Sequence, residues 1–243
     1  MPPSTAASSP PALTSSARAR AIIALVLIVP MATVGEAAAL WLWPGSLPGS
    51  SLYVLAKVWL VLVPLVWVLW VDRVPLSWSP ARAGGFGPAF ALGLLTAATI
   101  VGAYAIVRRA GWINLPAMRL AIAKNHLDNL ALYIAFALAL STANAVMEEY
   151  VWRWFVFRHC AALVPVVWAV PLAALFFTGH HISALKLYFN WPVTVLGSTG
   201  VWIGGMLWSW LYRRYRSIWP GVVAHMWADL AIFAVGGHMI FGQ

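Results

Sequence analysis

Charged residues are scarce in this chain, and cysteine is almost absent. Only 9% of its 243 residues are Asp, Glu, Lys or Arg, whereas 63% are hydrophobic and the mean hydropathy is +0.84. A soluble domain carries about 25% charged residues, so this chain has too few to cover a water-facing surface. The single cysteine, Cys160, excludes an intrachain disulfide framework and any metal site with several cysteine ligands. The composition therefore indicates a membrane protein.

Long apolar runs recur at the length needed to cross a bilayer. Each approaches the roughly 20 residues that a transmembrane helix requires, and runs such as LVLIVP lack the alternation of a barrel strand. The sequence predicts an all-α fold, a polytopic transmembrane helix bundle with about seven to eight membrane helices. The predicted spans are residues 20–42, 52–71, 86–107, 128–158, 171–189, 193–212 and 218–240.

The N-terminal end differs in composition from the rest. Residues 1–17 are rich in Pro, Ser, Ala and Thr, which predicts a disordered tail. We divide the remainder into N-terminal transmembrane helices without a motif, residues 18–127, and a transmembrane core that carries the motifs, residues 128–240. The basic residues before the first apolar run would also suit a signal peptide, but the run continues to Trp43, which favours a span.

The net charge of +9 fits membrane topology better than a nucleic-acid site. With a cytoplasmic N-terminus, the inside segments carry nine basic residues and the outside ones six, a mild positive-inside bias. Clusters such as Arg213-Arg214-Tyr-Arg216 suit contact with anionic lipid. We expect an integral protein of the cell inner (plasma) membrane with its N-terminus in the cytoplasm, membrane lipids as partners and no nucleic acid.

An adjacent acidic pair stands out because the chain has six carboxylates in total. Glu148 and Glu149 lie in an apolar stretch, and Arg153 follows four residues after Glu149. An ionisable group inside a bilayer costs about 2.5–3.5 kcal/mol on insertion scales, so its default interpretation is functional. The spacing favours an ion pair between Glu149 and Arg153. Glu36 has no motif around it, and we interpret it as structural or cavity-facing and outside the site.

Two later spans carry further polar groups. The fifth contains His180 and His181, which point about 100° apart on a helix. The seventh contains His225 and Asp229, whose spacing of four residues places them on one helix face.

The depths of these groups in the membrane agree. If the fourth span ends at 158 and the fifth begins at 171, Glu148 and His181 each lie ten residues, or ~15 Å, from the same membrane face. His225 lies ~10 Å from that face. The polar groups are therefore predicted to converge on one buried cavity.

Taken in order, the motifs resemble those of the CPBP family. Glu-Glu-x-x-x-Arg begins at Glu148, Phe-x-x-x-His ends at His181, and His-x-x-x-Asp runs from His225 to Asp229. This family contains the CAAX prenyl endopeptidases of the Rce1 type and the bacteriocin-processing or self-immunity proteins. The resemblance covers about residues 128–235 and implies that the core is the catalytic part of an intramembrane protease.

The resemblance also implies roles for the site residues. A general base would activate a water, a histidine would help to hold it, and the last motif would position the water or stabilise the oxyanion. The catalytic candidates, in this order, are Glu148, His181, His225 and Asp229, supported by Glu149 and Arg153.

Two points stay open at the level of sequence. His180 also fits the second motif, through Phe176, and is the alternative to His181. The last motif often ends in Asn in the prenyl endopeptidases, whereas here it ends in Asp229. An ionised Asp229 cannot donate to an oxyanion, so it would have to be protonated or orient His225.

The implied function is hydrolysis of a peptide bond in a membrane-associated or lipidated peptide by glutamate-activated water. No cofactor is expected. Zinc on two histidines and a glutamate is the alternative, although no His-Glu-x-x-His occurs on one helix. An inactive member that acts as a bacteriocin-immunity or membrane scaffold protein would keep the same cavity. A proton-coupled transporter would predict inverted repeats, which we do not detect.

Overall fold

The structure is a computed structural model that describes residues 14–113 and 129–242, and these residues contain helices but no strand. Residues 1–13 of the predicted tail lie outside the described residues. Residues 15–17, which we also assigned to that tail, form the first turn of helix α1 (Ser15–Ala37). The helix begins there because the Thr14 hydroxyl accepts a hydrogen bond from the backbone N–H of Ala17.

Seven long helical segments make up the described part of the chain. The first two end in π-helical turns, and the fourth contains two such turns. In order they are α1 with η1 (Ala38–Leu42); α2 (Leu47–Val66) with η2 (Trp67–Val71); α3 (Phe86–Arg109); the composite of α5 (Leu130–Ala139), η3 (Leu140–Asn144), α6 (Ala145–Glu149), η4 (Tyr150–Phe157) and α7 (Arg158–Leu163); α8 (Val166–Tyr188); α9 (Trp191–Tyr215); and α10 (Trp219–Phe241).

These segments confirm the predicted polytopic helix bundle. Six of the described segments are long and apolar enough to cross a membrane, and α9 falls short of that composition. Its run of Gly, Ser and Thr from Gly197 to Gly200 lowers its hydropathy although it extends over 25 residues. The predicted span 193–212 is thus a helix of the bundle that is more polar than its neighbours.

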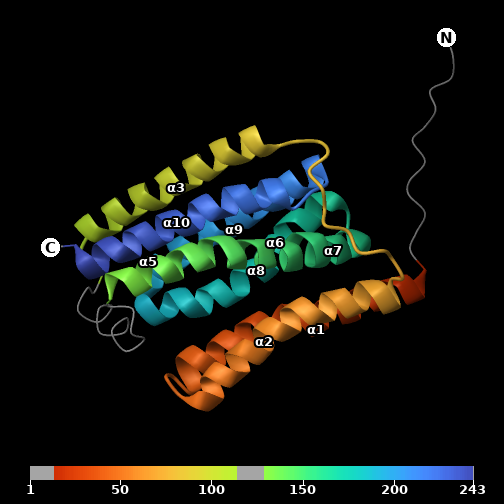
Figure 1. The fold of residues 1–243 in the computed structure, drawn as a ribbon, viewed down its shortest axis with the longest axis horizontal. Coiled ribbons are helices and arrows are strands. Elements are labelled where there is room, and N and C mark those ends of the chain that lie inside the picture. The colour runs from red at the N-terminus through yellow and green to blue at the C-terminus, as the bar shows by residue number, and fades with distance from the viewer. Residues whose placement is uncertain (1–13, 114–128, 243) are drawn as a thin grey trace, which may run out of the picture.

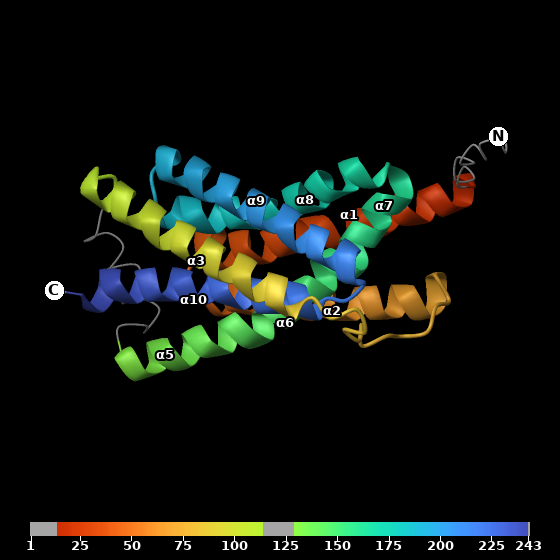
Figure 2. The same ribbon diagram turned by 90° about the horizontal axis from the view of Figure 1, so that it is seen from above.

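The long fourth segment is the centre of the arrangement. Figures 1 and 2 show the helices running along one axis, with α1 and α2 paired on one side and α3 lying along α10. The central α6 contacts α10, and η4 contacts α1, α2, α8 and α9. Side chains of α6 and η4 therefore face helices from both halves of the chain.

Close approach between helices depends on small residues, as expected in a membrane bundle. A Cβ atom on Gly35 of α1 would lie 2.6 Å from the Cβ of Ala56 on α2, and one on Gly205 of α9 would lie 3.1 Å from that of Ala174 on α8. These pairs bring α2 against α1 and α9 against α8.

The two expected boundaries between the fourth and fifth spans are wrong, and the first two helices begin at Ser15 and Leu47, each five residues earlier than predicted. The fourth segment ends at Leu163 instead of 158, and α8 begins at Val166 instead of 171, so Pro171 lies inside α8. Both boundaries move by five residues. Glu148 and His181 consequently remain equally far from the turn between α7 and α8, which keeps the two residues at a common depth.

Candidate active site

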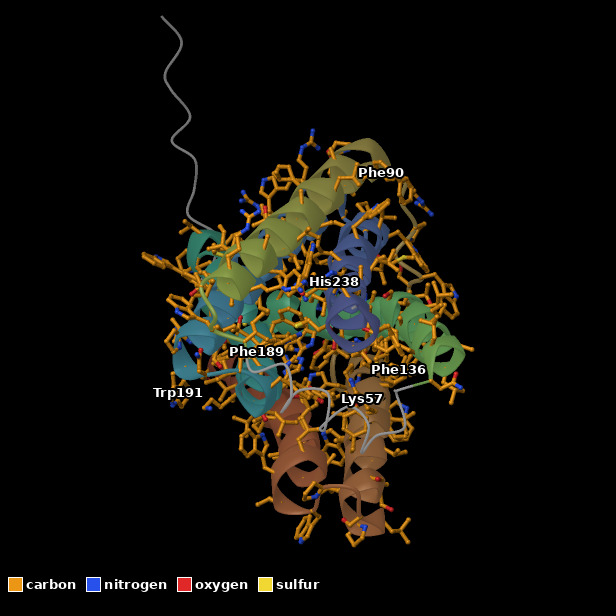
Figure 3. The ribbon with its side chains drawn as sticks, turned by 90° about the vertical axis from the view of Figure 1, so that its left-hand side faces the viewer. Lys57, Phe90, Phe136, Phe189, Trp191 and His238 are labelled. Atoms are coloured by element: carbon orange, nitrogen blue, oxygen red, sulfur yellow. The ribbon has the colours of Figure 1, made fainter. Side chains whose placement is uncertain are left out.

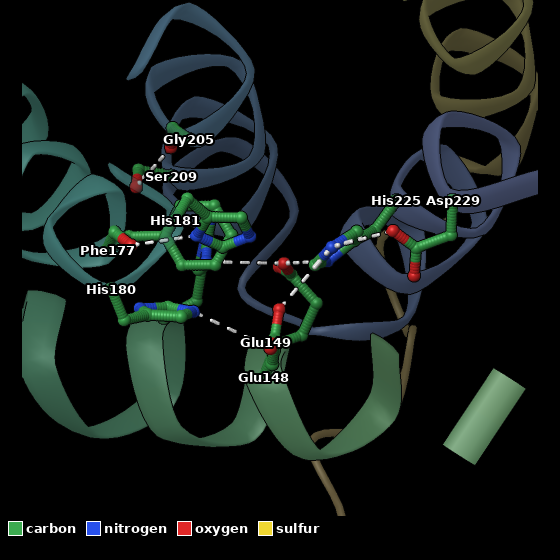
Figure 4. A network of polar contacts seen from close by, with 10 residues as sticks. Glu148, Glu149, Phe177, His180, His181, Gly205, Ser209, His225 and Asp229 are labelled. Atoms are coloured by element: carbon green, nitrogen blue, oxygen red, sulfur yellow. Dashed lines mark hydrogen bonds and ion pairs between the residues drawn. The ribbon is translucent and has the colours of Figure 1, made fainter. Parts of the chain in front are cut away.

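Two neighbouring carboxylates occupy α6, a short helix between two π-helical turns. Glu148 is 6% exposed and Glu149 is fully buried. Both project toward helices α8 and α10, as Figure 4 shows. π-helical turns often mark functional sites because they change which side chains share a face. Here η3 precedes the pair and η4 follows it.

Glu149 is held by two basic groups. Its Oε1 lies 3.4 Å from Nη1 of Arg153 and 3.1 Å from Nδ1 of His225. The Arg153 contact confirms the ion pair predicted from the spacing. The His225 contact was not predicted, because it joins two helices that are 76 residues apart in sequence.

Arg153 is stabilised by aromatic rings more than by hydrogen bonds. Its guanidinium carbon lies 4.6 Å from the ring centre of Phe177 and 5.1 Å from that of Trp208. None of its three side-chain nitrogens has a hydrogen-bond partner among the described residues. A desolvated cation over an aromatic face gains about 2 kcal/mol, so both rings help to offset the burial of this charge.

Glu148 lies between two histidines (Figure 4). Its Oε1 is 3.8 Å from Nε2 of His180, and its Oε2 is 3.6 Å from Nε2 of His225. These separations are too long for direct hydrogen bonds. They are typical of polar groups that share a water or a substrate atom.

Three carboxylates surround the His225 ring. Its Nδ1 faces Glu149, whereas its Nε2 is 3.6 Å from Oδ1 of Asp229 as well as near Glu148. The ring also stacks on Trp208, with centroids 4.0 Å apart and planes 14° apart. Glu149 and Trp208 together fix the orientation of the imidazole.

Both candidate histidines of α8 approach Glu148. His180 is 4% exposed, stacks on Trp152 and makes the 3.8 Å contact. The Nδ1 of His181 lies 3.1 Å from the carbonyl oxygen of Phe177, one turn earlier. One ligand atom from each of Glu148, His180 and His181 lies within 4.8 Å of the others.

The ligand types offered by Glu148, His180 and His181 suit a zinc ion. Two histidines and one carboxylate are a known catalytic zinc set. A zinc-bound histidine usually donates its other ring N–H to a carbonyl or carboxylate. His181 meets this condition through Phe177, whereas Nδ1 of His180 has no partner among the described residues.

A small cavity lies beside the Glu148 and His180 side chains. It has a volume of ≈ 10 Å³ and is lined by Glu148 and His180 on one side and by Glu36, Tyr53 and Lys57 on the other. From the sequence we placed Glu36 outside the site, because no motif surrounds it. A lone carboxylate in the first apolar span was the one sequence signal for it.

Gly221 of α10 leaves room for the Glu149 carboxylate. A Cβ atom at this position would collide with Oε2 of Glu149. We expect Gly221→Ala to lower the free energy of unfolding by about 1–3 kcal/mol, the usual cost of overpacking, and to reduce activity by displacing His225. The matched control is Gly200→Ala on α9, where a Cβ meets nothing within 4 Å. Unfolding in detergent measures both, and equal stabilities would contradict this role for Gly221.

The structure brings the predicted site residues together from three segments. Glu148, Glu149 and Arg153 come from α6 and η4, the two histidines from α8, and His225 with Asp229 from α10. Sequence reasoning missed the packing of Trp208 on His225 and the link from Glu149 to His225.

Comparison with known proteins places this site in a family. No curated protein and no solved structure matches the chain. A family model described as "Type II CAAX prenyl endopeptidase Rce1-like" matches residues 130–231, which include every predicted site residue. The described helices and this match show that the protein is an integral membrane protein. Its motif-bearing region, residues 130–231, belongs to the Rce1-like CAAX endopeptidases of the CPBP family of intramembrane proteases.

Proposed function

We propose that this protein is an intramembrane endopeptidase that hydrolyses a peptide bond of a membrane-associated or lipidated peptide with water activated by Glu148. One observation carries the proposal: the buried Glu148 carboxylate faces His180 at 3.8 Å and His225 at 3.6 Å. A carboxylate between two histidines, with space for water beside it, is suited to proton transfer during amide hydrolysis. The protein would lie in the inner (plasma) membrane with its N-terminus in the cytoplasm.

Glu148 acts as the general base in the first step. It takes a proton from the water while the water oxygen forms a bond to the scissile carbonyl carbon. In the second step the carbon–nitrogen bond breaks, and the same proton passes from Glu148 to the departing amine nitrogen. His180, in contact with Glu148, helps to hold the water and to move this proton.

His225 stabilises the oxyanion between these steps. Three carboxylates, Glu148, Glu149 and Asp229, approach its ring, and Arg153 forms an ion pair with Glu149. A second proton on His225 lowers the cost of burying this charge. Nε2 then donates to the oxyanion, while Glu149 accepts from Nδ1. Asp229 supports the charged imidazole and need not donate itself.

The test is cleavage of a defined lipidated peptide by the purified protein. We expect a farnesylated peptide that ends in a CAAX sequence to be hydrolysed in detergent micelles, with the products identified by mass spectrometry. The same peptide without the lipid separates lipid recognition from peptide recognition. Binding of the farnesylated peptide without hydrolysis would contradict the endopeptidase and favour the inactive, peptide-binding alternative.

His180 and His181 are expected to differ in their effect on hydrolysis. We expect His180→Ala to lower kcat by about 10²-fold, within the range for loss of acid–base assistance, because His180 contacts Glu148 and lines the cavity. His181→Ala is expected to cost about 10-fold, since its Nδ1 is engaged by Phe177. Measuring kcat of both variants on the same peptide tests this difference. A larger loss of kcat in His181→Ala than in His180→Ala would assign the water-holding role to His181.

We propose that the reaction needs no metal. Zinc held by Glu148, His180 and His181 would itself supply an activated water. Metal analysis of the detergent-purified protein should find well under one zinc per chain, and treatment with 1,10-phenanthroline should leave kcat unchanged. Stoichiometric zinc that is removed together with activity, and restores it on return, would contradict this proposal.

A further inference from the structure

Glu36 is a carboxylate of α1 without a protein partner on one oxygen. Its Oε2 is shielded from solvent and has no hydrogen-bond partner among the described residues. No ion pair within 4.0 Å joins it to a basic group of the described residues either. A buried acceptor left unmatched costs about 1–3 kcal/mol, so a partner outside the protein is expected.

A lysine that lines the same cavity as Glu36 has another partner. Lys57 of α2 donates a hydrogen bond of 3.1 Å to Oδ1 of Asn144 in η3. Figure 3 shows Lys57 on the side of the α1–α2 pair that faces the other helices. Asn144 thus ties the N-terminal pair to the segment that carries Glu148.

The cavity between these groups has room for about one water. Its volume of ≈ 10 Å³ is close to the minimum for a single ordered molecule. A buried water needs two to four polar partners. The polar side chains of the lining include Glu36 and Lys57 from the N-terminal helices, and Glu148 and His180 from the core.

We propose that Glu36 and Glu148 hold one water between them, and that Glu36 is a water-binding residue of the active site. The inference rests on the proposed function. A water that donates one hydrogen to each carboxylate has its lone pairs free for attack, and the hydrogen on Glu148 is the one transferred. Lys57 compensates the charge of the two carboxylates. The N-terminal helices, which carry no motif, thereby contribute to catalysis.

A structural role for Glu36 makes a different prediction. If Glu36 only joined helices, its loss would lower Tm, and activity would follow the folded fraction. If it binds the water, replacing it with an apolar residue of similar size removes the unmatched buried oxygen Oε2, which is neutral or stabilising. Activity would then fall without a fall in Tm.

The test compares Glu36→Leu with Glu36→Gln. We expect Glu36→Leu to lower kcat by on the order of 10-fold to 100-fold, less than loss of the general base, with KM within about twofold and Tm unchanged or higher. Glu36→Gln retains an acceptor and should lose less. Arg20→Gln, which removes an exposed charge from the same helix, should match the unaltered protein. Wild-type kcat in Glu36→Leu, or a loss of kcat that parallels a loss of Tm, would overturn the proposal.

A second measurement does not depend on variants. An experimental structure that resolves ordered waters should contain one within about 3.2 Å of both Glu36 and Glu148. A dry cavity, or a direct Glu36–Lys57 ion pair that fills it, would overturn the proposal. Failure of the proposed function is distinguishable, because it would show as full activity in Glu148→Gln whatever the Glu36 variants do.

Discussion

Replacement of Glu148 by glutamine is expected to lower kcat by about 10²–10⁴-fold, the contribution of a general base. The amide has nearly the shape of the carboxylate but cannot accept the proton of the attacking water. KM should change little, because Glu148 acts on the water more than on the peptide. Initial rates over a range of farnesylated peptide concentrations measure both constants.

A matched variant separates the loss of the general base from the general effect of replacing a carboxylate by an amide. Asp72 follows η2 directly, pairs with Arg158 and does not line the cavity. Asp72→Asn makes the same chemical change as Glu148→Gln and should keep kcat within a few-fold. If Glu148→Gln retains wild-type kcat while it folds normally, Glu148 is not the base.

Replacement of Arg153 by methionine is expected to lower the free energy of unfolding by about 3–5 kcal/mol, the usual effect of removing one partner of a buried ion pair. Arg153 is 1% exposed, and Glu149 would keep its charge at 0% exposure without this partner. The contacts with Phe177 and Trp208 would be lost as well. Unfolding of the purified protein by a denaturing detergent measures the change.

The control for Arg153 is an arginine at the surface. Arg213 is exposed in the last turn of α9. Arg213→Met is expected to change the free energy of unfolding by less than about 1 kcal/mol. A double variant of Arg153→Met with Glu149→Gln should be more stable than the sum of the two single losses predicts, because the stranded charge is gone. Additive losses would contradict the pairing.

Much of the fold follows from the sequence because a bilayer permits few solutions. A span must satisfy its backbone internally, so apolar length alone located the helices, including α3 and α10. The ends of the helices were harder to predict from the sequence, as Pro171 shows. We took it as the start of a span, but the Pro165 turn begins α8 earlier. The division into an N-terminal part, residues 18–127, and a core, residues 128–240, stays a prediction.

The site was predictable where residues are close in sequence. The spacing of four residues linked Glu149 to Arg153 and His225 to Asp229. Spacing could not reveal the contact of Glu149 with His225, because that depends on how α6 packs against α10. Nor could it choose between His180 and His181, since their directions depend on the rotation of α8. Glu36 was set aside because no local pattern connects α1 to the core.

We propose that this buried cluster hydrolyses peptide bonds in the cell. The most direct test of this proposal is proteomics of membrane fractions from cells that express either the unaltered protein or Glu148→Gln at equal levels. We expect membrane-associated or lipidated precursors to remain uncleaved in the Glu148→Gln cells and to be processed in the others. An identical set of precursor and product peptides in both would contradict it.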